Sequence, residues 1–138
     1  MTFKLDKVLE SDTIAIGDTP NYAIRLANDH RFPWVILVPK VPSITEVYQL
    51  EASVQQRLAI DSSVLGSEMM DLYKGDSLNT GALGNVVSQL HLHHVVRYKK
   101  DAAWPGPVWG CGKPKPYNLG ELEERLRSLR QSLSICSV

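Results

Sequence analysis

The chain has 138 residues and a mass of 15.4 kDa, a size that suits one domain with one hydrophobic core, here residues 1–138. Hydrophobic residues make up 43% of the chain, which argues against disorder. The 15 Lys and Arg residues balance the 15 Asp and Glu residues, and this zero net charge argues against a protein that wraps nucleic acid. A small phosphorylated ligand needs only local positive groups and remains open as a partner.

The first twelve residues, MTFKLDKVLESD, carry scattered charges and no apolar run, so they do not predict a secretory signal. No window of the chain approaches the ~18 apolar residues of a membrane span. Cys111 and Cys136 belong to no CxxC pair and no zinc-finger spacing, which predicts reduced thiols. We therefore expect a cytoplasmic protein with no membrane partner, no structural metal and no cofactor.

Three strands are predicted in the first third of the chain. Residues 13–17 and 22–26 alternate in polarity and flank the turn cluster at 18–21, a pattern typical of a β-hairpin. Residues 34–38, Trp-Val-Ile-Leu-Val, form a nearly continuous apolar run, as in a strand that is buried on both faces.

A long amphipathic helix is predicted next. Ser43 is expected to be its N-cap, with Glu46 three residues later completing a capping box. Apolar residues then recur at helical spacing and form one face: Val54, Leu58, Leu65, Met69 and Leu72. Gly75 and Asp76 are expected to end the helix.

The rest of the chain predicts one more strand and one more helix. Residues 86–96 are rich in β-branched and apolar side chains, which favours a strand. Asn118 with Glu121 repeats the capping-box pattern and begins a last helix. Five leucines form a stripe on it, interpreted as a core or dimer contact: Leu119, Leu122, Leu126, Leu129 and Leu133. This order of elements is that of an α+β domain with an antiparallel sheet.

Three of the four histidines lie in the strand predicted at 86–96. Alternation places Gln89, His91 and His93 on one face, and His94 on the mainly apolar face that packs on helices. Same-face neighbours are ~6.6 Å apart, so His91 and His93 can both touch one phosphate-sized group. His91 can then supply a neutral nitrogen as a nucleophile, while His93 or Gln89 stabilises oxygens on which charge builds up.

The residues around this strand allow several interpretations. The bend at 79–85, Asn-Thr-Gly-Ala-Leu-Gly-Asn, can present backbone N–H groups to an anion, although a plain turn is the simpler interpretation. His94 is interpreted as a core or interface histidine. His91 and His93 are also candidate metal ligands, but a metal needs a further group, such as His30 or a carboxylate, so metal binding ranks second.

The segment at 89–95, Gln-Leu-His-Leu-His-His-Val, resembles the signature of the histidine triad (HIT) superfamily of nucleotide hydrolases and transferases. It departs from the signature twice, since Gln89 replaces the first histidine and His94 replaces an apolar residue. Residues 34–40 resemble the family's strand that ends in Val-Pro-Lys, and residues 104–106 resemble a Trp-Pro segment of some members. The resemblance covers residues 14–110 in pieces. It implies about five antiparallel strands packed with a long central helix and a C-terminal helix.

On this resemblance, His91 is the nucleophile that attacks the α-phosphorus of a nucleotide and forms a nucleotidyl-histidine, which water or another acceptor resolves. His93 contacts phosphate oxygens, and the enzyme is a homodimer that hydrolyses nucleotide phosphoramidates or dinucleoside polyphosphates. The implied substrate-binding residues are Asn79 as the upstream Asn, Gly84 and Asn85 in the turn before the strand, and Asn28 or Asp29 near the ribose.

Three residues differ from what relatives often carry, namely Trp34 in place of a histidine, Val86 in place of a hydroxyl residue, and Gln89. Gln89 cannot carry a proton at neutral pH, so we expect slow turnover or a leaving group that needs little protonation. The same departures motivate a second hypothesis, a catalytically weak nucleotide-binding module. A metal protein that uses His91 and His93 is the third.

Overall fold

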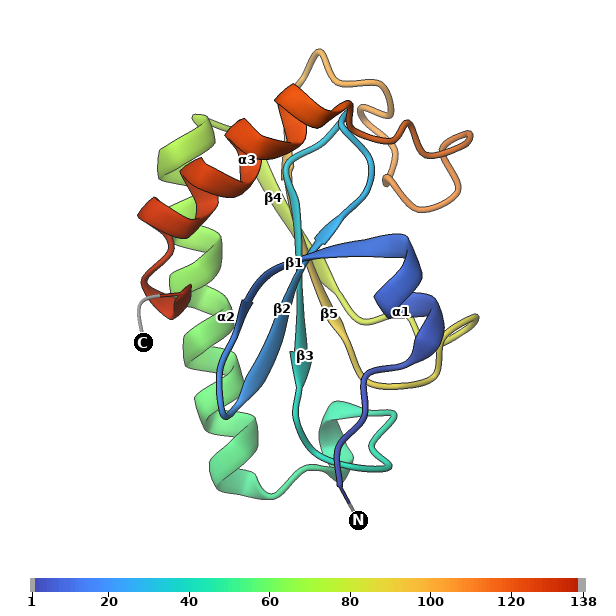
Figure 1. Cartoon of the computed structure of the whole chain (residues 1–138), viewed down its shortest axis with the longest axis vertical. Helices are drawn as coiled ribbons and strands as arrows, with labels where there is room; N and C mark the ends of the chain where they lie inside the picture. The colour runs from blue at the N-terminus through green and yellow to red at the C-terminus, as the bar shows by residue number, and fades with distance from the viewer. Residues whose placement is uncertain (1, 137–138) are drawn as a thin grey trace.

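The computed structural model describes residues 2–136 and contains one sheet with helices on both faces (Figure 1). Its elements follow in chain order: α1 (Lys7–Asp12), β1 (Thr13–Asp18), β2 (Tyr22–Ala27), β3 (Trp34–Pro39), the 3-10 helix η1 (Val47–Gln49), α2 (Ala52–Tyr73), β4 (Ser77–Gly81), β5 (Leu92–Arg97), α3 (Leu119–Ser132) and the 3-10 helix η2 (Ser134–Cys136).

The sheet has five strands in the order β1-β2-β3-β5-β4, and every neighbouring pair is antiparallel. The α+β fold predicted from the sequence is therefore confirmed. The hairpin at 13–26 is confirmed as well, with Thr13 paired to Ala27 and Asp18 to Ala23. The apolar run at 34–38 is the central strand β3, which is buried along nearly all of its length.

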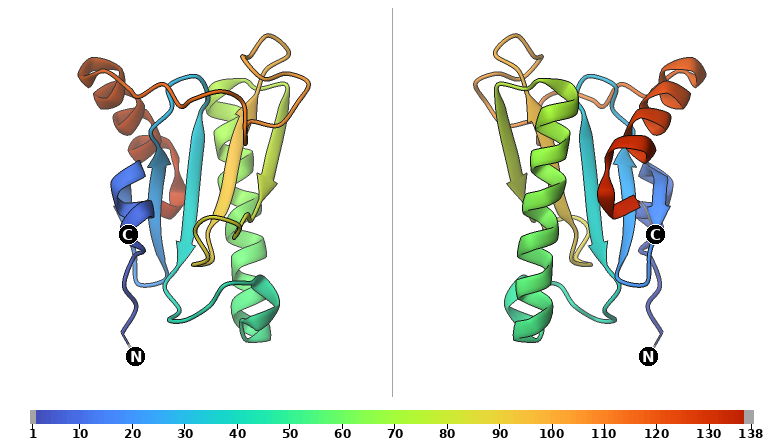
Figure 2. Two further views of the ribbon diagram at one scale, coloured as in Figure 1. Left: turned by 90° about the vertical axis from the view of Figure 1, so that its right-hand side faces the viewer. Right: turned by 90° about the vertical axis from the view of Figure 1, so that its left-hand side faces the viewer.

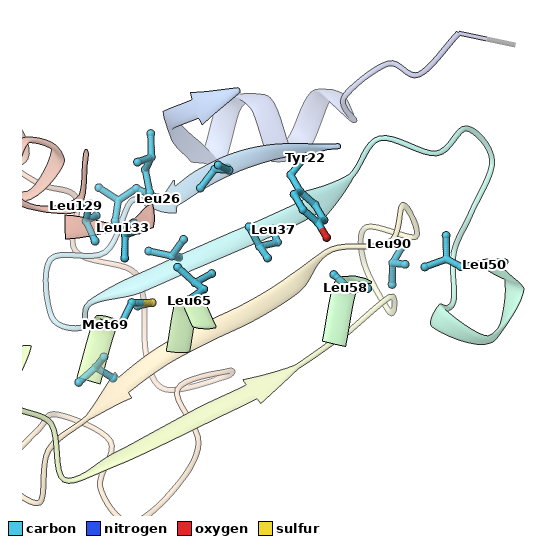
Figure 3. Packing of buried hydrophobic residues seen from close by; sticks show 14 residues of the cluster. Tyr22, Leu26, Leu37, Leu50, Leu58, Leu65, Met69, Leu90, Leu129 and Leu133 are labelled. Carbon is cyan, nitrogen blue, oxygen red and sulfur yellow. The ribbon is translucent and has the colours of Figure 1, made fainter. Parts of the chain in front are cut away.

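Two helices cover one face of the sheet, with α3 next to α2 (Figure 2). The predicted apolar stripe of α2 faces the sheet, since Leu58, Leu65 and Met69 are buried. The leucine stripe of α3 packs on the same core, except that Leu119 is 73% exposed. The core between the helices and the sheet consists of Ile16, Tyr22, Ile24, Leu26, Val35, Leu37, Leu50, Leu58, Leu65, Met69, Leu90, Val96, Leu129 and Leu133 (Figure 3). Within the described residues, no helix is long and apolar enough to cross a membrane.

The opposite face carries α1 and the long segment 98–118, which connects β5 to α3 across one end of the sheet (Figures 1 and 2). Leu9 of α1 packs with Ile36 and Val38 of the central strand. At the other end Val108 of the segment packs with Phe32 and Val95. The sheet face between α1 and segment 98–118 is the one on which the candidate site lies.

A buried ion pair fixes the start of segment 98–118. The Arg97 side chain is 2% exposed, and its Nε and Nη2 donate to the two carboxylate oxygens of Asp101 at 2.8 and 3.0 Å. Burial tends to raise the pKa of Asp101, but these bonds and three backbone N–H donors hold it well below its usual range. Arg97 also donates to Asn79 Oδ1 at 2.8 Å. The network therefore joins β4, β5 and the segment.

The predicted start of the long helix is wrong. Ser43 lies in a turn with a φ of 61°, and the N-cap of α2 is Glu51. Glu46 does form a capping box, but with Gln49 across η1. The Ser43–Glu46 pattern does not begin the helix, because a separate 3-10 helix precedes α2 and Glu46 is its N-cap.

The predicted boundaries of the histidine strand are also wrong. β5 begins at Leu92, and residues 82–91 form a loop that leaves the sheet after β4. Val86, where the predicted strand begins, is 93% exposed on this loop. Residues 79–81, predicted as the start of a bend, belong to β4, whose sequence Ser-Leu-Asn-Thr-Gly has little apolar character. An edge strand tolerates this composition, since only one of its sides needs a partner.

Candidate functional site

His91, the last residue of the loop at 82–91, and His93, the second residue of β5, lie close together. Their ring centroids lie 4.9 Å apart with the planes at 69°, and the residues are only 5% and 6% exposed. His91 precedes β5, so strand alternation alone does not place it. The proximity expected from the sequence is nevertheless found.

The backbone sets the tautomer of His91. Its Nδ1 lies 2.7 Å from the carbonyl oxygen of Gln89. A carbonyl oxygen only accepts, so Nδ1 carries the hydrogen and donates it. In the neutral ring Nε2 then keeps its unshared pair, which is the property that a nucleophilic nitrogen needs.

Trp34 sets the tautomer of His93. The indole Nε1–H donates to Nδ1 of His93 at 2.8 Å, so the hydrogen of the neutral imidazole sits on Nε2. Burial, followed by the neighbouring rings of His91 and His94, lowers the pKa of His93 to about 3. At neutral pH His93 is therefore uncharged and can donate one N–H to an acceptor such as a phosphate oxygen.

Both rings line a pocket of about 420 Å³, within the ~300–1,000 Å³ typical of small-molecule sites. Its walls come from the loop after β2, the loop before β5 and segment 98–118: Asp29, Arg31, Trp34, Leu83, Asn85, Val86, Val87, Val108, Trp109, Gly110, Cys111, Gly112 and Pro114. The lining is mostly apolar, with the polar groups gathered at the two histidines and at the Asp29–Arg31 pair.

An ion pair forms the polar wall of the pocket. Arg31 holds Asp29 with two hydrogen bonds, Nε to Oδ1 at 2.9 Å and Nη2 to Oδ2 at 2.8 Å. Burial raises the pKa of Asp29, but the donors on Arg31 and the backbone N–H of Lys115 outweigh it and lower the pKa. The third Arg31 donor, Nη1, reaches the carbonyl of Cys111 at 2.9 Å. Arg31 thus joins two walls of the pocket.

A smaller cavity of about 200 Å³ adjoins the pocket and extends toward α1. The two share several lining residues, among them Asp29, Trp34 and His93. Asn28 and Asp29, the two candidates for a ribose contact, both line this cavity. Asn28 also accepts a hydrogen bond from the backbone N–H of Tyr117 through its Oδ1, at 3.0 Å. Each therefore has a structural contact as well as a position beside the pocket.

Gln89 has a different position from the one expected. Its Oε1 accepts the backbone N–H of Asp6 at 2.9 Å, and its Nε2 donates to the carbonyl of Lys4 at 2.8 Å. Gln89 is not among the residues that line the pocket. The prediction that its amide faces the phosphate alongside the histidines is not what the structure shows, because the N-terminal segment takes up that amide.

The remaining candidates divide between the loop and the sheet. Asn85 lines the pocket, and Gly84 precedes it on the same loop without lining the pocket itself. Asn79 lies in β4, outside the pocket, where its Oδ1 accepts from buried Arg97. The β4–β5 pairing turns this amide toward the ion pair rather than the pocket, and its predicted contact with a substrate stays a prediction.

His94 is a core histidine, as interpreted from its alternation. Its Nδ1 donates to the carbonyl of Val35 at 3.3 Å, and its Nε2 accepts from the Ser62 hydroxyl on α2 at 2.7 Å. Burial lowers its pKa to about 4, although the bonds to backbone carbonyls oppose the shift. Both ring nitrogens are used, so His94 ties β5 to the helix face rather than to the pocket.

Three residues of the site are not among the candidates predicted from the sequence. Trp34 was noted only as a departure, yet its indole sets the His93 tautomer. Arg31 follows Asp29 by two residues, a spacing at which opposite charges in a loop can pair, and this signal was available. Trp109 packs on His93 with centroids 5.4 Å apart, and only the run of aromatic and proline residues around it marks the segment.

Within the part of the chain that the structure describes, no group of three or more His, Cys, Asp or Glu side chains lies close enough to hold a metal ion. Both cysteines are free thiols, and Cys111 lies at the pocket.

Comparison with known proteins identifies the fold and the family. The family model of the HIT domain matches residues 8–100. A histidine triad protein from Marinobacter aquaeolei VT8 is 46% identical, over 99% of each chain, with a TM-score of 0.95. Histidine triad proteins from Sinorhizobium meliloti 1021 and Bradyrhizobium japonicum are 39% and 36% identical, each over 96% of this chain and 98% and 99% of their own, both with a TM-score of 0.92. No curated protein matches the chain significantly.

Members of the HIT family are generally nucleotide hydrolases or transferases. The matched region contains both pocket histidines, the central strand and the loop that carries His91. The chain belongs to the HIT domain family of histidine triad proteins.

Proposed function

We propose that this protein is a nucleotide hydrolase or nucleotidyl transferase that acts at an α-phosphate through Nε2 of His91. The observation that carries the proposal is the bond from His91 Nδ1 to the Gln89 carbonyl, which leaves Nε2 as the free nitrogen of a ring that lines the pocket. The substrates are nucleotides with a group on the α-phosphate that can leave, phosphoramidates or dinucleoside polyphosphates.

The reaction balances in two steps. The unshared pair of Nε2 forms a bond to the α-phosphorus, and the bond from phosphorus to the leaving group breaks with its electrons on the leaving group. Water then attacks phosphorus, the N–P electrons return to Nε2, and the proton of the water passes to solvent. The Nε2–H of His93 and the amide of Asn85 donate to the phosphate oxygens during both steps.

The chain represents a variant of the family in which Gln replaces the first histidine of the triad. In this variant the Gln89 carbonyl orients His91, while the Gln89 amide holds the N-terminal segment. The nucleoside occupies the smaller cavity beside α1, where Asn28 or Asp29 meets the ribose. Support for this placement is that the two cavities share lining residues, His93 among them.

The test uses the p-nitrophenyl ester of AMP, adenosine 5′-phosphoramidate and a dinucleoside polyphosphate. Nucleotide release is measured with the wild type, with His91→Ala and with His30→Ala, the matched control for a histidine outside the pocket. We expect release by the wild type and the control and none by His91→Ala. Rapid acid quench and mass spectrometry should find one nucleotidyl group on the peptide that contains His91.

A nucleotide-binding module without catalysis is the second candidate, favoured by the lack of a protonatable group at positions 34 and 89. Calorimetry would then show AMP binding, while no substrate yields a covalent adduct. A trapped adduct on His91 contradicts this candidate, and equal activity of the wild type and His91→Ala contradicts the first.

We also propose that the protein forms a homodimer through α2 and the free edge of β4. Ile60 and Val64, one turn apart on α2, are 65% and 43% exposed, and within residues 2–136 β4 pairs only with β5. Light scattering should give a dimer for the wild type and for Leu119→Lys, a control on α3, and a monomer for Val64→Lys. A wild type that stays monomeric at high concentration contradicts the proposal.

A further inference from the structure

We propose that the pocket transfers nucleotidyl groups without a general acid and therefore selects substrates whose leaving group departs as a weakly basic oxyanion. The substrate class is the phosphoanhydrides, such as dinucleoside polyphosphates, and phosphoramidates are poor substrates. This inference rests on the proposed function and deepens it.

His93, whose ring lies beside that of His91, supplies no acidic proton. Nδ1 of His93 already accepts from Trp34, and an indole N–H donates a hydrogen bond without giving up its proton. The remaining N–H of His93 belongs to a neutral imidazole, because burial and the neighbouring rings keep the ring uncharged at neutral pH. A neutral imidazole can polarise an oxygen but cannot protonate a departing amine. Trp34 is thus a positioning residue that determines what His93 can do.

The position two residues before the nucleophile supplies none either. The Gln89 amide is bonded on both sides to the N-terminal segment, at the carbonyl of Lys4 and the N–H of Asp6. An amide side chain carries no transferable proton at neutral pH. Neither the indole that contacts His93 nor the amide of Gln89 can therefore supply a proton to the leaving group.

The other polar groups of the pocket do not replace them. Asp29 is held ionised by its two bonds to Arg31, and a guanidinium keeps its proton in proteins. The thiol of Cys111 points at the carbonyl of Ala102, 3.7 Å away. Among the residues that the structure describes, the pocket wall therefore contains no other side chain placed to act as the acid.

The mouth of the pocket suits a leaving group with negative charge. Lys113 and Lys115 are exposed and flank Pro114, which lines both the pocket and the smaller cavity. The guanidinium of Arg31 on the adjacent wall is paired with Asp29 and adds no net charge. The two lysines can neutralise a polyphosphate that extends from the reacting phosphorus into solvent.

The chemistry of the first step explains the selection. When Nε2 of His91 bonds to phosphorus in an anhydride, the broken P–O bond leaves its electron pair on a phosphate, which is stable as an anion. When the leaving group is an amine, the pair of the broken P–N bond falls on a strongly basic nitrogen, which must receive a proton as it departs. General acid catalysis contributes roughly 10²–10⁴-fold to the rate of such reactions. Its absence therefore slows the release of amines strongly and the release of phosphates much less.

The experiment measures the release of the leaving group in a single turnover. All substrates form the same nucleotidyl-histidine, so the hydrolysis of this adduct is the same whichever group has left. A series of aryl esters of AMP with phenols of graded acidity is compared with a dinucleoside polyphosphate and adenosine 5′-phosphoramidate. We expect a steep fall in rate as the phenol becomes more basic, and at least ~100-fold slower release from the phosphoramidate than from the polyphosphate.

Two variants test the origin of the selection. Trp34→His introduces a ring that can pass a proton to His93, so the ratio of polyphosphate to phosphoramidate rates should fall at least ~10-fold and the aryl-ester series should flatten. Trp34→Phe removes the indole donor without adding an acid, so the ratio should stay high while the rates fall together. The wild-type aryl-ester series tests the proposal even where a variant does not fold.

Equal wild-type rates for phosphoramidate and polyphosphate, or a flat aryl-ester series, would overturn the inference. So would a ratio that Trp34→His leaves unchanged. Failure of the proposed function looks different: the p-nitrophenyl ester, which needs no acid, would then give no adduct on His91 at all.

Discussion

Lowering the pH from 7 to 5 should strongly destabilise the folded protein through two buried histidines. The pKa of His93 is lowered to about 3 and that of His94 to about 4, in both cases chiefly by burial. In the unfolded chain both rings titrate at about 6.5, so below that pH the unfolded state binds more protons than the folded state. The stability that the neutral rings support is complete above about pH 6.5 and is lost as the pH falls toward the folded values.

The magnitude follows from the proton difference. Well below pH 6.5 each histidine contributes a slope of about 1.4 kcal/mol per pH unit, so the two together give about 2.7. Between pH 7 and pH 5 the unfolding free energy should fall by about 2 kcal/mol for each histidine, or about 4 kcal/mol in total. This is a large share of the ~5–15 kcal/mol by which domains are stable. Carboxylates titrate at lower pH when unfolded, so they contribute little in this window.

The assay is urea denaturation followed by tryptophan fluorescence at half-unit steps from pH 7.5 to 5. His94→Gln should lose stability at pH 7, because it disturbs the bonds to Ser62 and Val35, but its slope against pH should be about half that of the wild type. His30→Gln, the same substitution at an exposed histidine outside the pocket, is the matched control. A wild-type unfolding free energy that is flat between pH 7 and pH 5 would refute the reasoning, and so would an undiminished slope in His94→Gln.

Three further changes test single contacts by the same denaturation assay. Asp101→Ala leaves the buried Arg97 without its carboxylate and should cost about 3–5 kcal/mol; a loss below about 1 kcal/mol would contradict the buried ion pair. Gly75→Ala would place a Cβ 2.4 Å from Cγ1 of Val96 and should cost about 1–3 kcal/mol, whereas an unchanged midpoint would mean that this contact relaxes freely. Gln89→Ala removes two hydrogen bonds to the N-terminal segment and should cost about 1–3 kcal/mol and speed proteolysis before residue 7; a segment that stays equally protected would show that it is held by other contacts.

The elements with a strong local pattern were predictable from the sequence. The hairpin, the central strand and the apolar faces of α2 and α3 all follow from periodicity, because burial on one side imposes it. The capping box at Asn118 is found as predicted, with its side chain accepting from the backbone of Glu121 at 2.8 Å. The box expected at Ser43 is not found, because Glu46 is instead the N-cap of the 3-10 helix η1 and forms its capping box with Gln49.

The parts of the site that depend on distant segments were not predictable. Nothing near Gln89 in the sequence indicates that its amide will bond Asp6 and Lys4, which precede it by 83 and 85 positions. Asn79 and Arg97 meet only because β4 and β5 are neighbours, and β4 itself has too little apolar character to be recognised. The proximity of His91 and His93 is found as predicted, but the strand that was expected to carry both residues begins only at Leu92. The loop before β5, rather than strand alternation, places His91 beside His93.

The two hydrogen bonds on the Gln89 side chain have a practical consequence for work on this protein. The carbonyl of the same residue accepts from the His91 ring, so the contacts of Lys4 and Asp6 with the Gln89 side chain help to hold the backbone that orients His91. A shortened clone that lacks Lys4 and Asp6, or a bulky fusion placed against them, would loosen that carbonyl. Such a preparation would hold the His91 ring less firmly, so a purification handle is better placed at the other terminus.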